Sequence, residues 1–379
     1  MNSLIIATLA VALTGHLQGG LTKARDCFAD GLGQQILSKQ DSGNACLSPI
    51  SMQLCLSMLL NGVAGTSVGP LRKTLRLGAE SLDEVNIGNR KLMASLAGPN
   101  VTISDSVWLR SRSEPSSAFL SRIREDYAAD CFAVPDLDAA RPRINDWTRE
   151  HTKGRIPTLF DKPFKDAVAV LVNTVTFDGK WQTQFDPKRT RTAPFHTASG
   201  ETIEVPTMYL ETEFRHAQSG GASAVELPYA GGDYAMVCIL PPPVENVYAF
   251  AASLGASGIH DLVAHMEGGR YSVALPRFTF FSSYNMEPPL GRMGLEALYR
   301  GANLSGISPK IGRVEISEIV QKTWIKVDEE GTQAAAASGI VMAKSIPRGF
   351  IANRPFVFAI LHVGTGAVLF YGVVEHPGG

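Results

Sequence analysis

The sequence predicts one large mixed α+β fold, because helix-like patterns dominate its first part and strand-like patterns its second. No repeat or linker divides residues 21–379. Helical periodicity covers residues 21–38, 51–63, 82–96, 141–153, 244–254 and 286–295. Strand-like stretches cover residues 101–109, 167–177, 224–227, 234–240, 271–280, 315–327, 356–363 and 367–374. This order differs from a regular βαβ alternation and favours α+β packing.

Composition and charge narrow the class of protein further. Of the 379 residues, 45% are apolar and 19% are charged, so the chain can bury a large core without disulfide or metal staples. The net charge of −1 lacks the basic excess of a nucleic-acid binder. We therefore expect a globular protein with no nucleic-acid partner.

The first residues have the pattern of a secretion signal. Residues 4–13 are apolar and uncharged, which is too short to span a bilayer and fits the core of a signal peptide. We expect residues 1–20 to be removed and the protein to be secreted. The alternative is an apolar segment that packs on the first helix of a cytoplasmic protein. No other stretch looks long and apolar enough to cross a membrane, so no membrane partner is expected.

The five cysteines do not suggest a metal or redox site. No two are spaced as C-x2-C, and each lies among apolar residues, so buried free thiols are expected. A single disulfide remains an alternative. No cofactor and no metal are expected.

Three motifs resemble catalytic sequences but lack their context. Residues 65–69 (GTSVG) match G-x-S-x-G, but a helical pattern precedes Ser67 where a nucleophile elbow needs a strand. Residues 31–33 (GLG) lack the third glycine of a dinucleotide loop. His260 and His265 are five residues apart and would not share a helix face. The chain is therefore not expected to be an enzyme, and a hydrolase using Ser67 is a minor alternative.

The segment at residues 329–345 (EEGTQAAAASGIVMAKS) is the most informative part of the sequence. It carries no charge between Glu330 and Lys344. Read as a strand, both of its faces are small or apolar, as a central buried strand requires. Gly331 allows a backbone turn at its start. A loop-like run, Pro347-Arg348-Gly349, follows it.

Six motifs in order make the sequence resemble the serpin family over nearly all of residues 21–379. The motifs lie at Asn44 with Ser48-Pro49 and Ser51, at 144–156, at 173–181, at 303–307, at 331–338 and at 350–356. The resemblance implies a serpin fold with three β-sheets, about nine helices, an exposed reactive-centre loop and a metastable native state.

The resemblance also implies a function without catalysis. A target serine protease attacks the loop and forms an acyl-enzyme, and the cut loop then inserts into the largest sheet and distorts the protease. The segment from Gly331 to Lys344 would span about 46 Å at roughly 3.3 Å per residue. The hinge is expected to require small residues and consists of Glu329, Gly331, Thr332, Ala334, Ala335, Ala336, Ala337 and Ser338.

Two ways of counting place the scissile bond differently by one residue. Counting from Gly331 at the common family spacing places it after Ser345, and counting back from residues 353–355 places it after Lys344. We expect Lys344-Ser345, because a basic residue there suits the acidic pocket of trypsin-like proteases. A short loop with this junction resembles that of the antiplasmin members of the family. Met342 and Arg348 remain alternatives.

The resemblance also implies two clusters that support the loop and the sheet. Where the loop enters the sheet (the breach), Trp181 and Arg277 are expected beside Glu329, with Arg277 and Glu329 forming an ion pair. At the sheet centre (the shutter), Ser48, Ser51, Asn173 and Gln321 are expected to form a polar cluster. The family often has His where this chain has Gln321, which puts pH sensitivity at that point in doubt.

The remaining expectations concern modification and partners. Asn100 and Asn303 begin glycosylation sequons. Five basic residues could form a heparin-like polyanion site, and these are Arg72, Lys73, Arg76, Arg90 and Lys91. Acidic residues lie between them in the sequence, which favours an ordinary solvated surface instead.

We expect a monomer whose partner is a trypsin-like serine protease. A non-inhibitory serpin with a carrier, storage or chaperone role is the alternative, although such members usually carry bulky or charged hinge residues.

Overall fold

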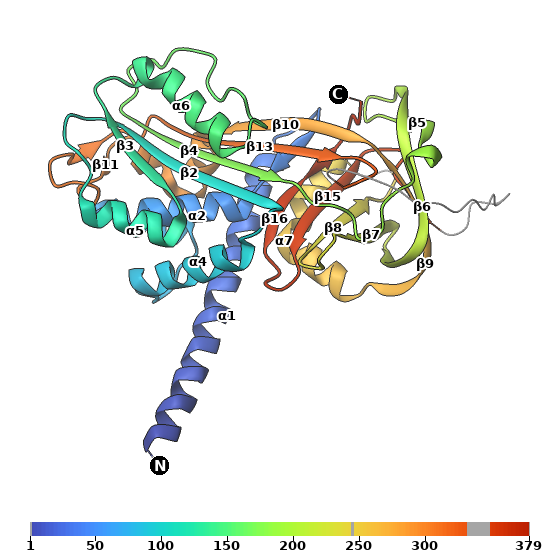
Figure 1. Ribbon diagram of the computed structural model, residues 1–379, viewed down its shortest axis with the longest axis horizontal. Helices are drawn as coiled ribbons and strands as arrows, with labels where there is room; N and C mark the ends of the chain where they lie inside the picture. Colours follow the sequence, from blue (N-terminus) through green and yellow to red (C-terminus); the bar gives the residue numbers. More distant parts are fainter. Residues whose placement is uncertain (1, 244–245, 332–348, 379) are drawn as a thin grey trace.

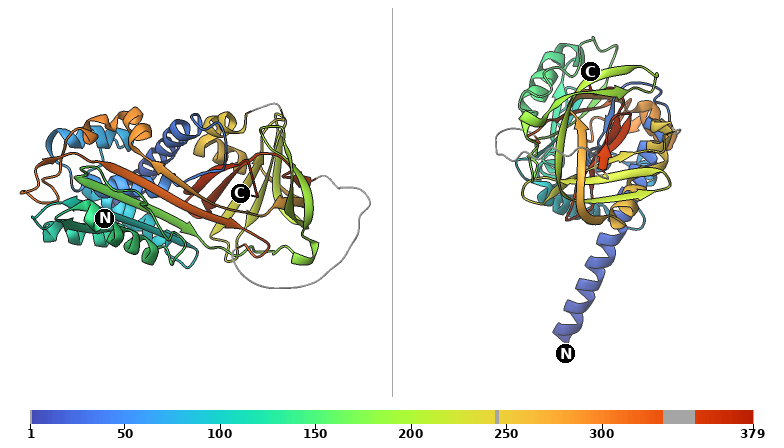
Figure 2. Two further views of the ribbon diagram at one scale, coloured as in Figure 1. Left: turned by 90° about the horizontal axis from the view of Figure 1, so that it is seen from above. Right: turned by 90° about the vertical axis from the view of Figure 1, so that its right-hand side faces the viewer.

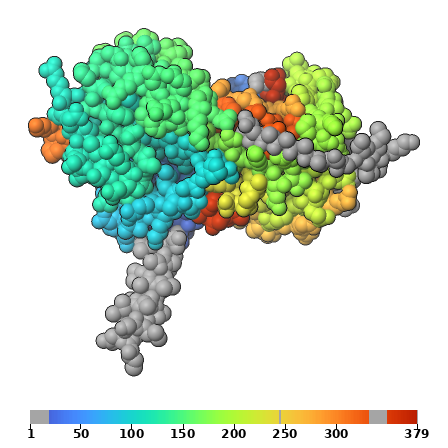
Figure 3. Space-filling model, viewed as in Figure 1, coloured from blue at the N-terminus to red at the C-terminus, as the bar shows by residue number. Residues whose placement is uncertain are grey.

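A computed structural model describes the backbone of residues 2–243, 246–331 and 349–378, and the side chains within these ranges from residue 19 onward. Figure 1 shows a sheet that crosses the upper part of the molecule and a second, strongly curved sheet beside it. In Figure 3 the surface of α4, α5 and α6 forms one side of the visible face, and the surface of the β5–β9 region forms the other.

The first sheet has five strands in the order β10-β13-β4-β2-β3. Their bounds are β10 (Phe278–Asn285), β13 (Glu318–Val327), β4 (Ala169–Phe177), β2 (Val101–Arg110) and β3 (Asp130–Val134). The two central strands, β4 and β13, are parallel, whereas each also pairs with an antiparallel neighbour on its other side.

The second sheet has nine strands, eight in the order β1-β16-β15-β8-β7-β6-β9-β14 with β5 paired to β6. Their bounds are β1 (Ala45–Leu47), β5 (Arg191–His196), β6 (Thr202–Ser219), β7 (Ala222–Pro228), β8 (Tyr234–Leu240), β9 (Glu267–Pro276), β14 (Gly349–Ile351), β15 (Phe356–His362) and β16 (Val368–Val374). A third sheet consists of β11 (Ala302–Asn303) and β12 (Arg313–Val314).

Helices cover both faces of the five-stranded sheet, with α6 on its outer face and α2 beneath it (Figure 1). The α-helices are α1 (Asn2–Leu37), α2 (Pro49–Leu60), α3 (Val68–Thr74), α4 (Leu82–Leu96), α5 (Ser117–Tyr127), α6 (Leu137–His151), α7 (Val247–Ala264), α8 (Glu287–Leu290) and α9 (Glu296–Tyr299). The 3₁₀ turns are η1 (Gly65–Ser67) and η2 (Pro187–Arg189), and η3 (Gly291–Leu295) is a π-helical turn. Every residue of α2 is buried, because this apolar helix lies inside the molecule between the sheets.

The predicted α+β class with three sheets is confirmed, and most predicted helices and strands lie within a few residues of their expected positions. The stretch 271–280 is wrong as one strand, because the chain changes sheets at Arg277, between β9 and β10. Several elements were missed, of which β6 and α5 are the longest, because their exposed faces carry polar residues that resemble loop composition.

The membrane prediction needs a correction. Within the described part of the chain, α7 is long and apolar enough to cross a membrane by length and composition. It bends at Gly255 (φ 58°, ψ −172°) and packs against α1, β15 and β16. These contacts are those of a core helix in a globular domain.

The cysteine prediction holds for four thiols and is wrong for the fifth. Cys46, Cys55, Cys131 and Cys238 are buried and free, whereas Cys27 is free but exposed. Cys27 lies on a face of α1 that opens to a surface pocket also lined by Arg76 and Gly255. Cys27 follows the charged residues Arg25 and Asp26, and only one face of a helix packs on the core, so this thiol is not buried.

Candidate functional site

The parallel pair β4–β13 is the centre of the candidate site. Seven residue pairs join the two strands, from Glu318 with Val170 to Trp324 with Thr176. Figures 1 and 2 show the two strands side by side along the molecule, pointing the same way. The chain leaves β13 at Val327, turns at residues 328–331 and continues into residues 332–348. A segment that turned back between the two strands would therefore run antiparallel to both.

Backbone hydrogen bonds fix the breach at the end of β13. The Trp181 amide donates to Glu330 O (3.0 Å), and the Phe185 amide donates to Glu329 O (2.9 Å). The Trp181 indole donates to Asp328 O (2.8 Å) and stacks on the buried Tyr229 with ring centroids 4.4 Å apart. The start of the loop is thus held against the chain that follows β4.

Gly331 occupies a position that no other residue fits well. Its φ of +93° lies in the left-handed region, which disfavours side chains. A Cβ atom there would lie 2.3 Å from Gly179 O and 2.4 Å from the Trp181 amide nitrogen. The turn into the loop therefore depends on both the conformational freedom and the small size of glycine.

An ion pair lies beside this turn. Arg277 Nε donates to Glu329 Oε1 (2.7 Å), Arg277 Nη2 contacts the same oxygen, and the Thr190 hydroxyl also donates to it. The Glu329 side chain is 5% exposed and that of Arg277 is 44% exposed. Burial alone would raise the pKa of Glu329, but the bonds from Arg277 and Thr190 outweigh it and hold the pKa below its ordinary value.

The four predicted shutter residues meet in one buried cluster. Gln321 Nε2 donates to Asn173 Oδ1 (2.7 Å) and to Ser48 O (2.9 Å), and Gln321 Oε1 accepts from the Ser48 amide (2.9 Å). Asn173 Nδ2 donates to Ser51 Oγ (2.5 Å). Ser48 caps α2 and is followed by Pro49, which suits the first turn of a helix. The start of α2 therefore bonds to both strands, through Ser48 to β13 and through Ser51 to β4.

Sequence reasoning missed Asp105, which belongs to the same cluster. Asp105 lies on β2 opposite Asn173 and is 1% exposed. Its Oδ1 accepts a hydrogen bond from Asn173 Nδ2 (2.7 Å). Burial raises the pKa of Asp105 to about 7, although hydrogen bonds from Asn173 and Cys55 partly oppose the shift. An acidic residue inside a predicted strand was the available indication.

A second residue missed by the sequence is Thr190, which bonds Glu329 from the segment after η2. Nothing in its local sequence indicates this contact, because the two residues are 139 positions apart.

Helix α6 covers the outer face of the β4–β13 pair. A compact apolar cluster joins Ile144 and Trp147 of α6 to Val170, Val172 and Val320 of the two strands. Separation of β4 from β13 must therefore disturb this packing as well as the shutter bonds.

The predicted reactive bond and most of the hinge lie outside the described residues. These are Thr332, Ala334, Ala335, Ala336, Ala337, Ser338, Lys344 and Ser345. The structure describes the breach, the shutter and the first hinge residues, Glu329 and Gly331.

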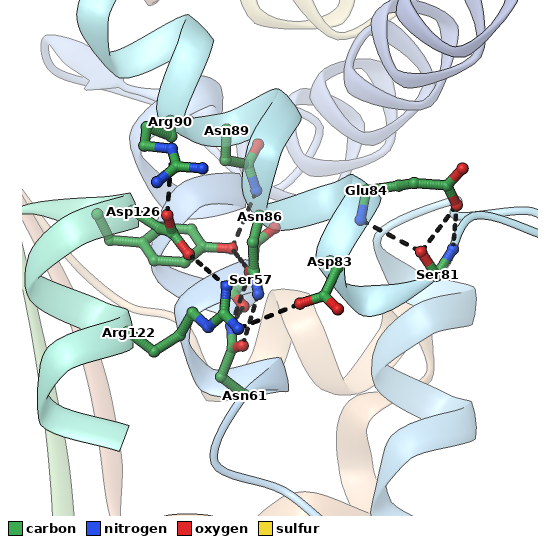
Figure 4. A network of polar contacts seen from close by, with 11 residues as sticks. Ser57, Asn61, Ser81, Asp83, Glu84, Asn86, Asn89, Arg90, Arg122 and Asp126 are labelled. Atoms are coloured by element: carbon green, nitrogen blue, oxygen red, sulfur yellow. Dashed lines mark hydrogen bonds and ion pairs between the residues drawn. The ribbon is translucent and has the colours of Figure 1, made fainter. Parts of the chain in front are cut away.

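A polar network ties α2, α4 and α5 together (Figure 4). The Tyr127 hydroxyl donates to Asn86 Oδ1 (2.6 Å), and Asn86 exchanges hydrogen bonds with Asn61 (2.8 and 3.0 Å). The buried Asp126 carboxylate lies 3.5 Å from Arg90 Nε and 3.3 Å from Arg122 Nη1. Two guanidinium groups thus face one buried carboxylate.

Two arginines of the basic group considered as a polyanion site make contacts within the protein. Arg90 faces Asp126, and Arg72 donates to the backbone oxygens of Gly78 (2.9 Å) and Glu80 (2.6 Å). These contacts support structural roles for both arginines.

The two sequons differ in their surroundings. Asn100 is partly buried in the turn before β2, and its carbonyl accepts from the Asp178 amide (2.6 Å). Asn303 lies in β11, and its side-chain oxygen accepts from the Ser305 amide (3.1 Å).

The Ser67 motif lacks the geometry of a nucleophile elbow. It ends a 3₁₀ turn after helix α2, and its hydroxyl accepts a hydrogen bond from the Asn303 amide (3.0 Å). The hydroxyl is buried in a structural contact between distant segments rather than presented at the end of a strand.

The site thus combines the parallel β4–β13 pair, the outer helix α6, the buried capped helix α2 and a turn at residues 328–331 that is bonded to the chain after β4. The family model "Serpin (serine protease inhibitor)" matches residues 23–377. The chain belongs to the serpin family.

Relatives agree with this assignment over most of the chain. The chain is 30% identical to "Serpin A3-5" of Bos taurus, over 94% of this chain and 89% of that protein. It is 31% identical to "Leukocyte elastase inhibitor" of Bos taurus, over 94% of this chain and 99% of that protein. The solved structure of the thermophilic serpin Tengpin in the native state matches with a TM-score of 0.85 and 28% identity, over 94% of both chains. The predicted serpin resemblance is confirmed.

Proposed function

We propose that this serpin inhibits a trypsin-like serine protease as a suicide substrate, by inserting its cleaved loop between β4 and β13. The observation that carries the proposal is the parallel β4–β13 ladder, at whose end the chain enters the loop. The uncharged small residues that follow Gly331 in the sequence suit a strand buried on both faces.

Insertion changes the hydrogen bonding of the sheet in a favourable direction. One parallel ladder is replaced by two antiparallel ladders, and parallel pairing is slightly less stable per residue. The new strand gains ladder bonds worth about 0.5–1.5 kcal/mol each and buries apolar residues near its end. Opposing this gain, the Asn173–Gln321 bond must break and the contacts of α6 with the strands must shift.

The covalent chemistry belongs to the protease. Its serine oxygen attacks the Lys344 carbonyl carbon, the Lys344–Ser345 amide bond breaks, and the Ser345 nitrogen leaves as an amine after taking up a proton. Lys344 remains bound to the protease as an ester. Insertion of the loop then carries that ester along the sheet before water can hydrolyse it.

The specificity is tested with trypsin on a denaturing gel. The wild type should form a covalent complex, and Lys344→Arg should preserve it because the charge is kept. Lys344→Leu should lose it, because the charge partner of the protease pocket is missing, an effect of orders of magnitude on acylation. Mass spectrometry should show a released fragment beginning at Ser345. A fragment beginning at Ile346 would place the reactive bond one residue later.

The hinge is tested separately from the specificity. Ala336→Arg would bury an unpaired charge in the inserted strand, at a cost of several kcal/mol. Insertion should slow, and more inhibitor should be consumed per protease trapped, whereas the matched control Ala336→Ser should behave as wild type. Simple cleavage of the wild type without a complex would indicate a non-inhibitory serpin.

We also propose that the protein is secreted and acts as a monomer. Residues 1–20 would be removed during secretion, after which residues 21–379 would act as one serpin domain with sugars at Asn100 and Asn303. Amino-terminal sequencing and glycosidase treatment of the secreted protein test these points. Retention of residues 1–20 would favour a cytoplasmic protein.

A further inference from the structure

Asp105 lies at one end of a row of side chains that crosses the path of loop insertion. In the five-stranded sheet, Asp105 of β2 is opposite Asn173 of β4, and Asn173 is opposite Gln321 of β13. The row is continuous through hydrogen bonds, from Gln321 Nε2 to Asn173 Oδ1 (2.7 Å) and from Asn173 Nδ2 to Asp105 Oδ1 (2.7 Å). Asp105 therefore helps to orient the amide that bridges β4 and β13.

The surroundings of Asp105 are neutral. From α2 the facing titratable group is the Cys55 thiol, whose pKa is raised well above its ordinary value, mainly by burial. From β4 the facing group is the Asn173 amide. Tyr299 interacts with Cys55 and keeps its proton, because burial raises its pKa. Within the described ranges, Asp105 forms no ion pair.

The ionisable groups on the other side of the sheet do not face Asp105. Asp130 and His151 lie with Trp147 of α6, whose indole donates to Asp130 Oδ2 (2.9 Å) and which packs on the outer cluster. Asp105, in contrast, faces α2 on the inner side, where Asn173 also contacts Ser51. An ionised Asp105 would thus be a buried charge with neutral neighbours, which is costly.

We propose that Asp105 is a pH-sensitive latch that keeps β4 and β13 closed when protonated and loosens them when ionised. Opening between β4 and β13 lets water reach the cluster, so the open state accommodates the carboxylate better than the closed state does. The consequence for loop insertion rests on the proposed function, whereas the effect on stability does not.

The raised pKa of Asp105 determines how the stability of the fold changes with pH. The pKa of Asp105 is raised from 3.8 to about 7 in the folded protein, so folding favours its protonated form. This stabilising contribution is fully present below the ordinary pKa and is lost as the pH rises towards 7. Between roughly pH 5 and 7 the unfolding equilibrium constant should rise by up to about tenfold per pH unit.

Urea unfolding of the intact full chain between pH 5 and 8.5 tests the latch. The wild-type midpoint should fall up to about pH 7 and then level off, and Asp105→Asn should remove this fall. The matched control is Asp126→Asn, which removes an equally buried carboxylate that two arginines face. It should keep the wild-type slope. The same slope in Asp105→Asn as in wild type would overturn the proposal.

Thiol labelling gives a second test without a variant. Cys55 lies beside Asp105, whereas Cys238 is buried in β8 of the other sheet. The ratio of their alkylation rates cancels the intrinsic pH dependence of thiols and should rise severalfold from pH 5.5 to 7.5. A constant ratio would contradict the latch.

Peptide annealing separates this inference from the proposed function. A synthetic peptide of residues 332–343 should insert into the wild-type sheet faster at pH 8 than at pH 6, and equally fast at both in Asp105→Asn. If the peptide fails to insert at any pH while the urea slope is as expected, the latch stands and the insertion mechanism fails. Equal wild-type rates at both pH values would overturn the latch.

Discussion

At the residue scale, Gly331 is restricted in both size and backbone conformation. Gly331→Ala should destabilise the protein by more than the roughly 1–2 kcal/mol that a left-handed side chain costs, because its Cβ also meets two backbone atoms. The matched control is Gly232→Ala, where φ is +78° and no atom lies within 4 Å of the added Cβ. Urea unfolding compares the two, and equal losses would show that the contact with Gly179 and Trp181 is unimportant.

Glu329 should confer acid sensitivity on the breach. Its pKa is held below the ordinary value in the folded state, so its stabilising contribution is present above the ordinary carboxyl pKa and is lost as the pH falls. Glu329→Gln should cost about 1–2 kcal/mol at pH 7, because neutral hydrogen bonds replace charge-assisted ones.

The experiment is urea unfolding at pH values from 3 to 7. Glu329→Gln should show a smaller loss of stability in acid than the wild type. The exposed pair of Glu296 with Arg300 supplies the control, and Glu296→Gln should change stability by less than about 0.5 kcal/mol. An unchanged acid profile in Glu329→Gln would refute the role of the ion pair.

The sequence allowed four residues of the shutter cluster to be predicted, but not the fifth. Ser48, Ser51, Asn173 and Gln321 could be proposed because the motifs that contain them resemble a known family. Asp105 could not be assigned to the cluster in the same way. Its protonation depends on burial and on partners from β4 and α2, which only the folded arrangement brings together.

At the scale of elements, the β4–β13 pair should have to separate for function. Thr174 and Lys322 are paired across it, so Thr174→Cys with Lys322→Cys should form a disulfide that joins the strands. The oxidised variant should be cleaved by the protease without trapping it, and reduction should restore the inhibitory complex.

The control uses the same first substitution on a different pair of strands. Ser104 is opposite Thr174 across β2–β4, so Ser104→Cys with Thr174→Cys joins strands that need not separate. This variant should trap protease in both redox states. Trapping by the oxidised β4–β13 variant would contradict insertion at this place.

Elements differed in how well the sequence predicted them. α4 and β8 have the predicted bounds. α4 combines a helical period with a capping serine, and β8 is a continuous apolar run between turn residues and a run of prolines. β9 and β10 were merged into one strand, because the apolar pattern continues through Arg277 although the chain passes into another sheet. A change of sheet depends on tertiary packing and leaves no local periodic mark.

At the scale of the whole molecule, the proposed mechanism requires a native state that is not the most stable arrangement of the chain. The five-stranded sheet has a parallel pair, β4 and β13, between which a strand running antiparallel to both could be added. Under the proposed mechanism, the breach, the shutter and α6 would act as barriers that keep β4 paired with β13.

The central claim is that cleavage of the loop releases this stored free energy, and thermal unfolding tests it most directly. A protease that nicks the loop without being trapped supplies the cleaved protein, and nicked Ala336→Arg serves as the control that should not gain stability. The nicked wild type should melt tens of degrees higher than the intact protein, at about 2–4 °C per kcal/mol of stabilisation. Equal melting temperatures for intact and nicked protein would contradict loop insertion.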